Sequence, residues 1–425
     1  MPQIQSSSTG NLTLDTIDIV GDQTYADHGY PHEAWSLLRR KAPIFWYERP
    51  GIIPFWAVTK YEDLVQIGKT PEIFENAPRL AVFPDFEAQG VVQPPVRHLL
   101  NMDPPDHARY RRLISSYFTP RAVQRMRVGV ETITRQLLDE VMGDGSIQSG
   151  DFVQLVSAKL PLAVLADLLG IPREDWELMF RWTNETIGAA DPEYRREGET
   201  AEETGERARL ALFQYYAEMV EKRRAEPKED IVSVLANGKL EGGEDVPWME
   251  LLSYFYVLVV AGNETTRNAT TGGLLALLQN PAELSKLREN PELIDKAVEE
   301  IVRWTSPVIQ FCRTPNRDVE LRGQHIKAGQ NMTLFYPSAN RDEDIFQDPF
   351  SFKIDRDPNP HVAFGMGEHV CLGANLARLE LKEVFTQLLP RLEHCEVTGE
   401  PDRLRSSFVG GIKRLPIRYK LRPAL

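Results

Sequence analysis

The sequence predicts a mainly α-helical protein with a smaller β part, built as one large domain. Segments with apolar residues at every third or fourth position fill the middle of the 425-residue chain. Short runs rich in β-branched and aromatic residues lie around glycines toward both ends. Since no stretch resembles an interdomain linker, we expect a single domain over residues 19–425, after a flexible polar arm at residues 1–18.

The first elements expected are a strand, a loop and a helix. Residues 55–59 are aromatic and β-branched, which predicts a strand. Prolines and a glycine interrupt residues 78–100, and an irregular segment of that length is often a binding loop. A helix should begin after the two prolines at residues 104–105, with Asp106 as its cap.

Helices then dominate the chain until two β regions near the C-terminus. Two short strand-like runs between residues 319 and 335 flank Gly323 and Gly329, and residues 408–421 are typical of strands around two glycines. Strong helix formers occupy residues 374–389. The central helices are predicted at residues 122–141, 155–169, 205–224 and 248–279.

Charge and cysteine content exclude several classes of protein. The 62 acidic residues against 49 basic ones give a net charge of -13, which repels nucleic acid and anionic membranes. Three cysteines without a CxxC pair fit a reducing setting. The longest apolar run, residues 251–261, is shorter than the ~20 residues that span a bilayer, and the polar N-terminus lacks the features of a signal peptide. We expect a cytoplasmic protein that binds neither nucleic acid nor membrane.

Cys371 lies among glycines directly before a predicted helix. Unpaired N–H groups and the helix dipole at such a position favour a thiolate, which is a ligand for iron. The surrounding glycines would let the backbone approach a flat macrocycle and direct amide donors at the sulfur. A lone cysteine is nevertheless most often a small buried hydrophobic residue. Neither Cys312 nor Cys395 has a comparable setting.

A glycine and two polar residues interrupt the apolar helix predicted at residues 248–279. Gly262 lowers helix stability by ~1 kcal/mol, and Thr265 can bond back to a carbonyl one turn earlier. Glu264 adds an acid beside them. Such violations of local rules cluster at functional sites, although a polar stripe facing solvent is the alternative interpretation.

Two further pairs have helical spacing. Glu300 and Arg303 lie three residues apart on one predicted helix face, and His107 and Arg111 lie four apart on another. Ion pairs at such spacings are usually surface features worth only ~0.3–0.5 kcal/mol. Spacing alone therefore assigns neither pair a function.

Taken together, these segments resemble the cytochrome P-450 family of haem-thiolate monooxygenases. Residues 364–373 fill every fixed position of the family's signature Phe-Gly-x-Gly-x-His-x-Cys-x-Gly, and residues 261–265 resemble its oxygen-binding Ala-Gly-x-(Asp/Glu)-Thr stretch. Glu300 and Arg303 resemble its Glu-x-x-Arg pair. The resemblance implies the family's fold, with haem b between the oxygen-binding helix and the helix that follows the cysteine loop.

The resemblance also assigns roles. It implies that Cys371 is the axial iron ligand, that Glu264 and Thr265 form the catalytic proton relay, and that Glu300 and Arg303 are a structural pair. A third partner of this pair is expected near Asn340, Arg341 or Arg356. The residues expected to contact haem are His107, Arg111, Ala261, Gly262, Arg313, Phe364, Gly365, His369, Cys371 and Gly373. Those expected to line the substrate pocket are Val257, Leu258, Val308, Ile309, Phe408 and Val409.

The implied reaction is hydroxylation of a hydrophobic small molecule by dioxygen, with a terpenoid, an alkyl chain or fatty acid, or a steroid as substrate. Electrons would come indirectly from NAD(P)H through an iron–sulfur ferredoxin and its reductase, because the haem domain takes up the chain. The protein is expected to act as a monomer. A basic docking patch for the ferredoxin is expected at Arg109, Arg112, Arg378 and Lys382.

Two other classes stay open. A peroxide-driven or isomerising haem-thiolate enzyme would share the cysteine segment, as would a non-catalytic haem sensor or carrier. Glu264 and Thr265 favour the monooxygenase, since a proton relay would have no purpose in a carrier.

Overall fold

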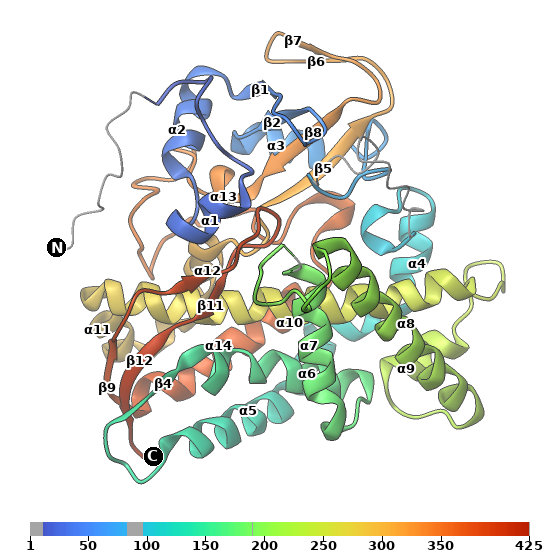
Figure 1. Ribbon diagram of the computed structural model, residues 1–425. Helices are drawn as coiled ribbons and strands as arrows, with labels where there is room; N and C mark the ends of the chain where they lie inside the picture. Colours follow the sequence, from blue (N-terminus) through green and yellow to red (C-terminus); the bar gives the residue numbers. More distant parts are fainter. Residues whose placement is uncertain (1–11, 83–96, 189, 425) are drawn as a thin grey trace.

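The computed structural model describes residues 12–82, 97–188 and 190–424. Its helices gather around α10 (Trp248–Gln279), which crosses the middle of the molecule in Figure 1. A smaller sheet-rich part lies above α10 in that view. The expected fold class, mainly α with a smaller β part, is therefore confirmed.

The helix α10 is long and buried because its sequence is apolar around most of its circumference. Its 32 residues extend over about 48 Å at 1.5 Å per residue. Leu251 and Phe255 are 0% exposed, and so are Ser253 and Thr271 on the other side of the helix, so opposite faces of the helix are covered. Its ends are those expected from the sequence. The helices that pack on it include α6 (Lys159–Leu169), α7 (Trp176–Ile187), α8 (Ala201–Ala225), α12 (Ile294–Thr305) and α14 (Ala374–Arg391).

The remaining helices surround this layer. The longest of them, α5 (Pro120–Met142), lies beside α14 on the far side of α14 from the sheet-rich part (Figure 1). The others are α1 (Asp22–His28), α2 (His32–Lys41), α3 (Tyr61–Gly68), α4 (Asp106–Ser115), α9 (Ile231–Asn237), α11 (Pro281–Glu289) and α13 (Tyr336–Ala339).

The largest sheet has five strands in the order β1-β2-β8-β5-β3. The pair β2 and β8 is parallel and the other neighbours are antiparallel. A second sheet has the order β4-β12-β9, and two hairpins complete the β part. The strands are β1 (Ile44–Tyr47), β2 (Phe55–Val58), β3 (Phe74–Glu75), β4 (Gln148–Asp151), β5 (Gln310–Pro315), β6 (Val319–Leu321), β7 (Gln324–Ile326), β8 (Asn331–Phe335), β9 (Leu392–Val397), β10 (Asp402–Arg403), β11 (Ile412–Arg414) and β12 (Pro416–Leu421).

The end of the expected N-terminal arm is part of the domain. Ile17 is 1% exposed and packs in a core cluster with Trp35 and Phe55. The Arg49 side chain donates to the Asp15 carbonyl oxygen at 3.0 Å. The expected boundary at residue 18 is thus too late, because an apolar side chain draws residues 13–18 onto the core. Residues 1–11 lie outside the described part of the chain.

Three other expectations need correction. Residues 319–335 form three strands rather than two, because Gly323 adopts a φ of 75° and allows a tight hairpin between β6 and β7. The helix expected at residues 155–169 begins as a π-helix at Val153–Ser157 and becomes α-helical only from Lys159. Asp106 starts α4 but does not cap it, because its carboxylate pairs with arginines instead.

The expected binding loop is described only at its edges, since residues 83–96 lie outside the described residues. Val82, before this gap, is buried and donates its N–H to the Gln310 side chain at 3.0 Å. Among the helices described, none combines the length and the apolar composition needed to cross a membrane.

Candidate active site

A cavity lies between α10 and the loop that leads into α14. Together with the solvent space at its open side, the hollow measures about 1660 Å³. Its described walls are mostly apolar and come from α4, α6, α10, α14, the start of β5 and residues 363–373. Apolar cavities with a few polar groups are typical of small-molecule sites.

The loop before α14 depends on glycine at two positions. Gly365 and Gly367 have φ values of 72° and 64°, which side chains disfavour. A Cβ atom on Gly367 would also lie 2.1 Å from the Gly68 carbonyl oxygen. The loop then closes with a hydrogen bond of 2.8 Å from the Cys371 N–H to the Phe364 carbonyl oxygen. This backbone presents Cys371 to the cavity.

Gly373 serves the cavity differently. Its φ of -83° is open to any residue, so no turn requires glycine there. A Cβ atom built on it meets no described atom within 4 Å and would enter the cavity. The missing side chain therefore leaves a flat stretch of wall beside Cys371, which fits the face of a planar macrocycle.

The helix start does not by itself make Cys371 a thiolate. Burial raises the pKa of the Cys371 thiol above its usual value, although the Gly373 N–H and the charges of Arg111 and Arg378 lower it. The N–H of Gly373 at the helix start therefore favours the thiolate in the expected direction, but it does not outweigh burial. Binding to a cation would deprotonate the thiol. Neither Cys312 nor Cys395 lines this cavity, and burial raises the pKa of both thiols to about 11.

Four basic side chains expected from separate parts of the sequence meet on one wall. The rings of His107 and His369 stack with centroids 3.9 Å apart and planes at 26°. The Arg111 and Arg313 side chains donate to the carbonyl oxygens of Val370 and Cys312, each at 2.7 Å. All four line the cavity.

The charges of this wall fit carboxylate groups. Burial and neighbouring charges lower the pKa of His107 to about 4 and that of His369 to about 2, so the two guanidinium groups carry the positive charge at neutral pH. The His369 Nε2 atom is buried without a hydrogen-bond partner among the described residues. Guanidinium forks and an unsatisfied ring nitrogen are what the propionates of haem would bind.

On the opposite side, α10 contributes Ala261, Gly262 and Thr265 to the cavity. The Thr265 hydroxyl donates back to the Ala261 carbonyl oxygen at 2.8 Å, as its position in the helix predicted. A Cβ atom built on Gly262 would lie 3.4 Å from the Leu165 side chain of α6, an ordinary packing distance, so contact with α6 does not require glycine there.

Glu264 does not line the described wall of the cavity. Its side chain is 1% exposed and forms an ion pair with Arg267, one turn further along α10. Arg267 in turn donates to the Asn184 side-chain oxygen of α7 at 2.9 Å. Burial raises the pKa of Glu264, and Arg267 lowers it less strongly. The alternative of a solvent-facing polar stripe is excluded, since Asn263 is also 0% exposed.

The six expected pocket residues fall into two groups. Val257, Leu258 and Val308 line the cavity. Ile309 is 0% exposed and packs into the core cluster that holds Trp35, so it points away from the cavity. The other two expected residues stand behind the wall: Val409 pairs with Val308 in a β-bridge, and the Phe408 ring packs on Phe311 at 5.7 Å. Alternation along the extended chain explains why Val308 and its neighbour Ile309 point to opposite sides.

The sequence reasoning missed much of the apolar wall. It is formed by Leu99, Leu100, Leu165, Leu168, Phe311 and Leu376, among others. Alternation within β5 could have indicated Phe311, because it shares a strand face with Arg313, which was expected at the site and also lines the cavity.

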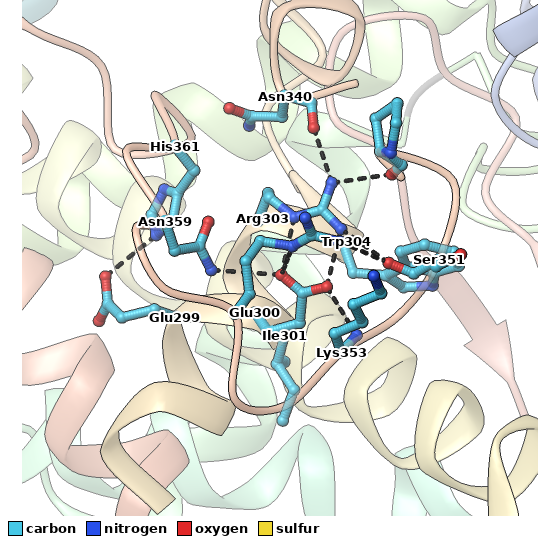
Figure 2. A network of polar contacts seen from close by, with 12 residues as sticks. Glu299, Glu300, Ile301, Arg303, Trp304, Asn340, Ser351, Lys353, Asn359 and His361 are labelled. Carbon is cyan, nitrogen blue, oxygen red and sulfur yellow. Dashed lines mark hydrogen bonds and ion pairs between the residues drawn. The ribbon is translucent and has the colours of Figure 1, made fainter. Parts of the chain in front are cut away.

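The expected Glu300 and Arg303 pair is a buried network rather than a surface ion pair (Figure 2). Both side chains are 0% exposed, and two parallel hydrogen bonds of 2.7 Å join them. Arg356 is the third partner, with its Nε atom 3.1 Å from Glu300. Arg303 also donates to the Asn340 carbonyl oxygen at 2.8 Å. Arg341, the other candidate, bonds to carbonyl oxygens at the end of α12.

The four expected docking cations are all paired in the structure. Each faces a carboxylate, so the patch carries little uncompensated positive charge. The pairs are Arg109 with Glu244, Arg112 with Glu241, Arg378 with Glu299 and Lys382 with Asp295. The expectation of a free basic patch at these residues is corrected accordingly.

Glu380 was not expected at the site. It lies on α14, lines the cavity, and its Oε2 atom has no hydrogen-bond partner among the described residues. Burial raises its pKa to about 8, so the carboxyl is mostly protonated at neutral pH. Only its position among the leucines of a predicted helix hinted at burial.

We expect Glu380→Gln to remove a pH-dependent loss of stability. The folded state raises the Glu380 pKa from 4.5 to about 8, so wild-type stability falls as pH rises through that window. Glutamine lacks this titration and should make the protein ~1–3 kcal/mol more stable at pH 8, with little difference at pH 5. Thermal unfolding at both pH values measures the effect. Glu383→Gln on the same helix breaks an ion pair with Arg127 and should give no gain in stability. An equal effect of Glu380→Gln at both pH values would contradict the raised pKa of Glu380.

Comparison with known proteins gives a consistent result. The family model for cytochrome P450 matches residues 16–422. A steroid C26-monooxygenase of Mycolicibacterium smegmatis is 39% identical over 400 residues, which cover 92% of this chain and 90% of that protein. Cytochrome P450-terp of a Pseudomonas species is 35% identical over 415 residues, covering 94% and 96%. A methyl-branched lipid omega-hydroxylase of Mycobacterium tuberculosis is 37% identical over 394 residues, covering 91% and 90%.

Solved structures agree with this. A Mycobacterium marinum cytochrome P450 in complex with pseudoionone superposes with a TM-score of 0.86 at 34% identity, over 95% of this chain and 98% of that one. A cytochrome P450 of Novosphingobium aromaticivorans gives a TM-score of 0.85 at 32% identity, over 95% and 97%.

Proposed function

This chain belongs to the cytochrome P450 family, and from that membership we propose that Cys371 binds the haem iron next to a hydrophobic substrate. The chain is a P450 monooxygenase with haem b as its cofactor, and its electrons come from an external redox partner. One observation carries the assignment of residues: a single cavity collects Cys371, the Thr265 turn of α10 and the basic wall around His369.

The residues of the cavity fit haem from three sides. Cys371 would bind the iron through its sulfur, and Gly373 would leave room for the macrocycle beside it. Arg111, Arg313 and His369 would hold the two propionates through their guanidinium groups and the free Nε2 atom. When bound, haem supplies reductive activation of dioxygen.

Thr265 and Glu264 act as the proton relay. The Thr265 hydroxyl donates a hydrogen bond to the Ala261 carbonyl oxygen. The lone pairs of the hydroxyl oxygen therefore remain available as acceptors at the cavity. Glu264 holds a proton more readily than an exposed glutamate, since burial raises its pKa. Its ion pair with Arg267 holds the Glu264 carboxylate away from the cavity. The Glu264 side chain would therefore have to rotate to reach the cavity.

Replacement of the relay residues should lower the amount of product formed per NAD(P)H consumed. We expect Glu264→Gln to lower product formation by ~100-fold, because positioned proton donors contribute ~10²–10⁴ in rate. Thr265→Ala should divert electrons to hydrogen peroxide. NAD(P)H use, product and peroxide are measured with an added ferredoxin and its reductase. Thr270→Val, which removes the same back-bond one turn along α10 but away from the described cavity wall, is the matched control. Unchanged product per NAD(P)H in both relay variants would refute the assignment.

The substrate is a steroid side chain, a terpenoid or a methyl-branched alkyl chain. The apolar wall offers hydrophobic contact with few polar anchors, and relatives named for such substrates share over a third of their residues with this chain. Spin-state difference spectra with one compound from each class test the proposal. A saturable shift with at least one class, followed by incorporation of labelled dioxygen into the product, is expected. Silence with all three classes would overturn it.

The redox partner is an iron–sulfur ferredoxin reduced by its own reductase, and the enzyme acts as a monomer. NAD(P)H-driven turnover should require both added proteins. Equal turnover with hydrogen peroxide alone would favour a peroxide-driven enzyme instead.

A further inference from the structure

We propose that Glu299, Arg378 and His361 form a positioning triad that holds the cysteine loop against α12 and α14. The proposal rests on the assignment of Cys371 as iron ligand and goes beyond it, because none of the three residues lines the described cavity wall. They come from three elements: α12, α14 and the segment that enters the loop.

The centre of the triad is the Glu299 carboxylate. The Arg378 Nε and Nη2 atoms donate to its two oxygens at 2.6 and 2.9 Å, which is the two-point geometry that makes such pairs strong. The His361 Nε2 atom lies 3.0 Å from the second oxygen. Figure 2 shows Glu299 and His361 facing each other beside the buried Glu300 network. One carboxylate therefore joins α12 to both sides of the cysteine loop.

The other end of the triad reaches the loop itself. The Arg378 guanidinium lies 4.5 Å from the centre of the Phe364 ring, a cation–π distance. The His361 ring lies 5.9 Å from the same ring, and its Nδ1 atom accepts the Ala363 N–H at 3.4 Å. Phe364 accepts the Cys371 N–H at 2.8 Å. A chain of contacts thus runs from Glu299 to the residue that holds the Cys371 backbone.

The adjacent carboxylates of α12 bind different residues of the segment that enters the cysteine loop. Glu300 accepts from the Asn359 side chain at 3.2 Å, and Glu299 fixes His361 two residues later. The Val362 N–H then bonds to the Asn340 side-chain oxygen at 2.8 Å. Hydrogen bonds therefore hold the approach to the cysteine loop at residues 359, 361 and 362.

The Glu299 carboxylate is ionised at neutral pH. Burial raises the pKa of Glu299, but hydrogen bonds from His361 and Arg378 outweigh burial and hold it at about 2. Since its fork is occupied by Glu299, Arg378 is not a free docking cation.

The reduced, carbon monoxide-bound spectrum of the holoenzyme tests the triad, because it separates thiolate-ligated haem from haem that has lost the thiolate. We expect Arg378→Gln and Glu299→Gln to increase the rate at which the thiolate form is lost on warming by about threefold or more, as a network of partly exposed pairs allows. Arg378→Lys keeps the charge but not the fork and should be intermediate. Lys382→Gln, which breaks another α14–α12 ion pair without touching the loop, should behave as wild type.

Each outcome decides a different question. Wild-type decay rates in Arg378→Gln and Glu299→Gln, with normal haem content, would overturn the triad. If Arg378→Gln does not fold, Glu299→Gln decides alone, because it is the milder change. If the unsubstituted enzyme shows no thiolate form at all, the assignment of Cys371 fails, and that result is distinct from failure of the triad.

Discussion

Replacement of Cys371 by serine is expected to abolish monooxygenase turnover while the chain still folds. The side chain faces the cavity, and the loop is shaped by the backbone of Gly365 and Gly367 rather than by the thiol. Serine retains the size but cannot supply a thiolate to push electron density onto the iron. We expect turnover to fall by more than ~100-fold, about 2.7 kcal/mol of barrier at 1.36 kcal/mol per tenfold. Product formation with added redox proteins measures the loss.

Cys395→Ser is the matched control. Cys395 is half-buried in β9, distant in sequence from the loop and absent from the cavity wall. Its replacement should leave turnover and haem content unchanged. Turnover of the Cys371 variant at the level of the Cys395 variant would contradict the role given to Cys371.

Replacement of Arg303 by alanine should have the largest effect on stability. Arg303 and Glu300 are both fully buried, and Arg303 also binds carbonyl oxygens of Asn340 and Pro349 (Figure 2). Removal of one partner of a buried ion pair leaves the other charge poorly compensated, at a cost of ~3–5 kcal/mol. We expect little folded holoprotein, and Arg303→Lys should be only partly better, since an ammonium cannot form the two-point contact.

An exposed pair provides the comparison. Arg418 and Glu396 pair on β12 and β9 with side chains 55% and 41% exposed. Arg418→Ala should cost ~0–1 kcal/mol. Denaturant unfolding of the two variants should therefore differ clearly, and equal midpoints would show that the Glu300 network is not required for stability.

The elements that sequence reasoning predicted best carry strong local signals. The apolar length of α10 and the glycines around Cys371 are properties of neighbouring residues, so the helix ends and the loop were readable. The π-helical start before α6 was not, because it depends on packing against α10 and α5. Ile17 was missed for a similar reason: the apolar residues Leu12, Leu14 and Ile17 do not share the spacing of one helix or strand face.

The site residues that belong to a sequence motif could be predicted. Contacts between residues far apart in the sequence could not, because they depend on long-range packing. His107, Arg111, Arg313 and His369 meet as the family resemblance implied. The ion pairs that neutralise the expected docking cations join residues 79 or more positions apart, as for Arg378 and Glu299, and no local spacing reveals them. The same holds for Glu380, whose raised pKa results from burial in the folded state.

Glu264 illustrates both cases. Its pairing with Arg267 is a three-residue helical spacing that the sequence contains. Its position behind the cavity wall is set by α7, which supplies Asn184 to Arg267. Sequence reasoning could therefore identify the acid but not the arginine that restrains it.

The most direct test of the central claim is the absorption spectrum of the purified, unsubstituted protein after reduction under carbon monoxide. Ligation by Cys371 predicts the long-wavelength Soret band of thiolate-ligated haem, and its absence from the Cys371→Ser variant. A protein that turns over substrate but shows only the short-wavelength band of thiol- or nitrogen-ligated haem would contradict the claim, as would an unchanged long-wavelength band in the variant.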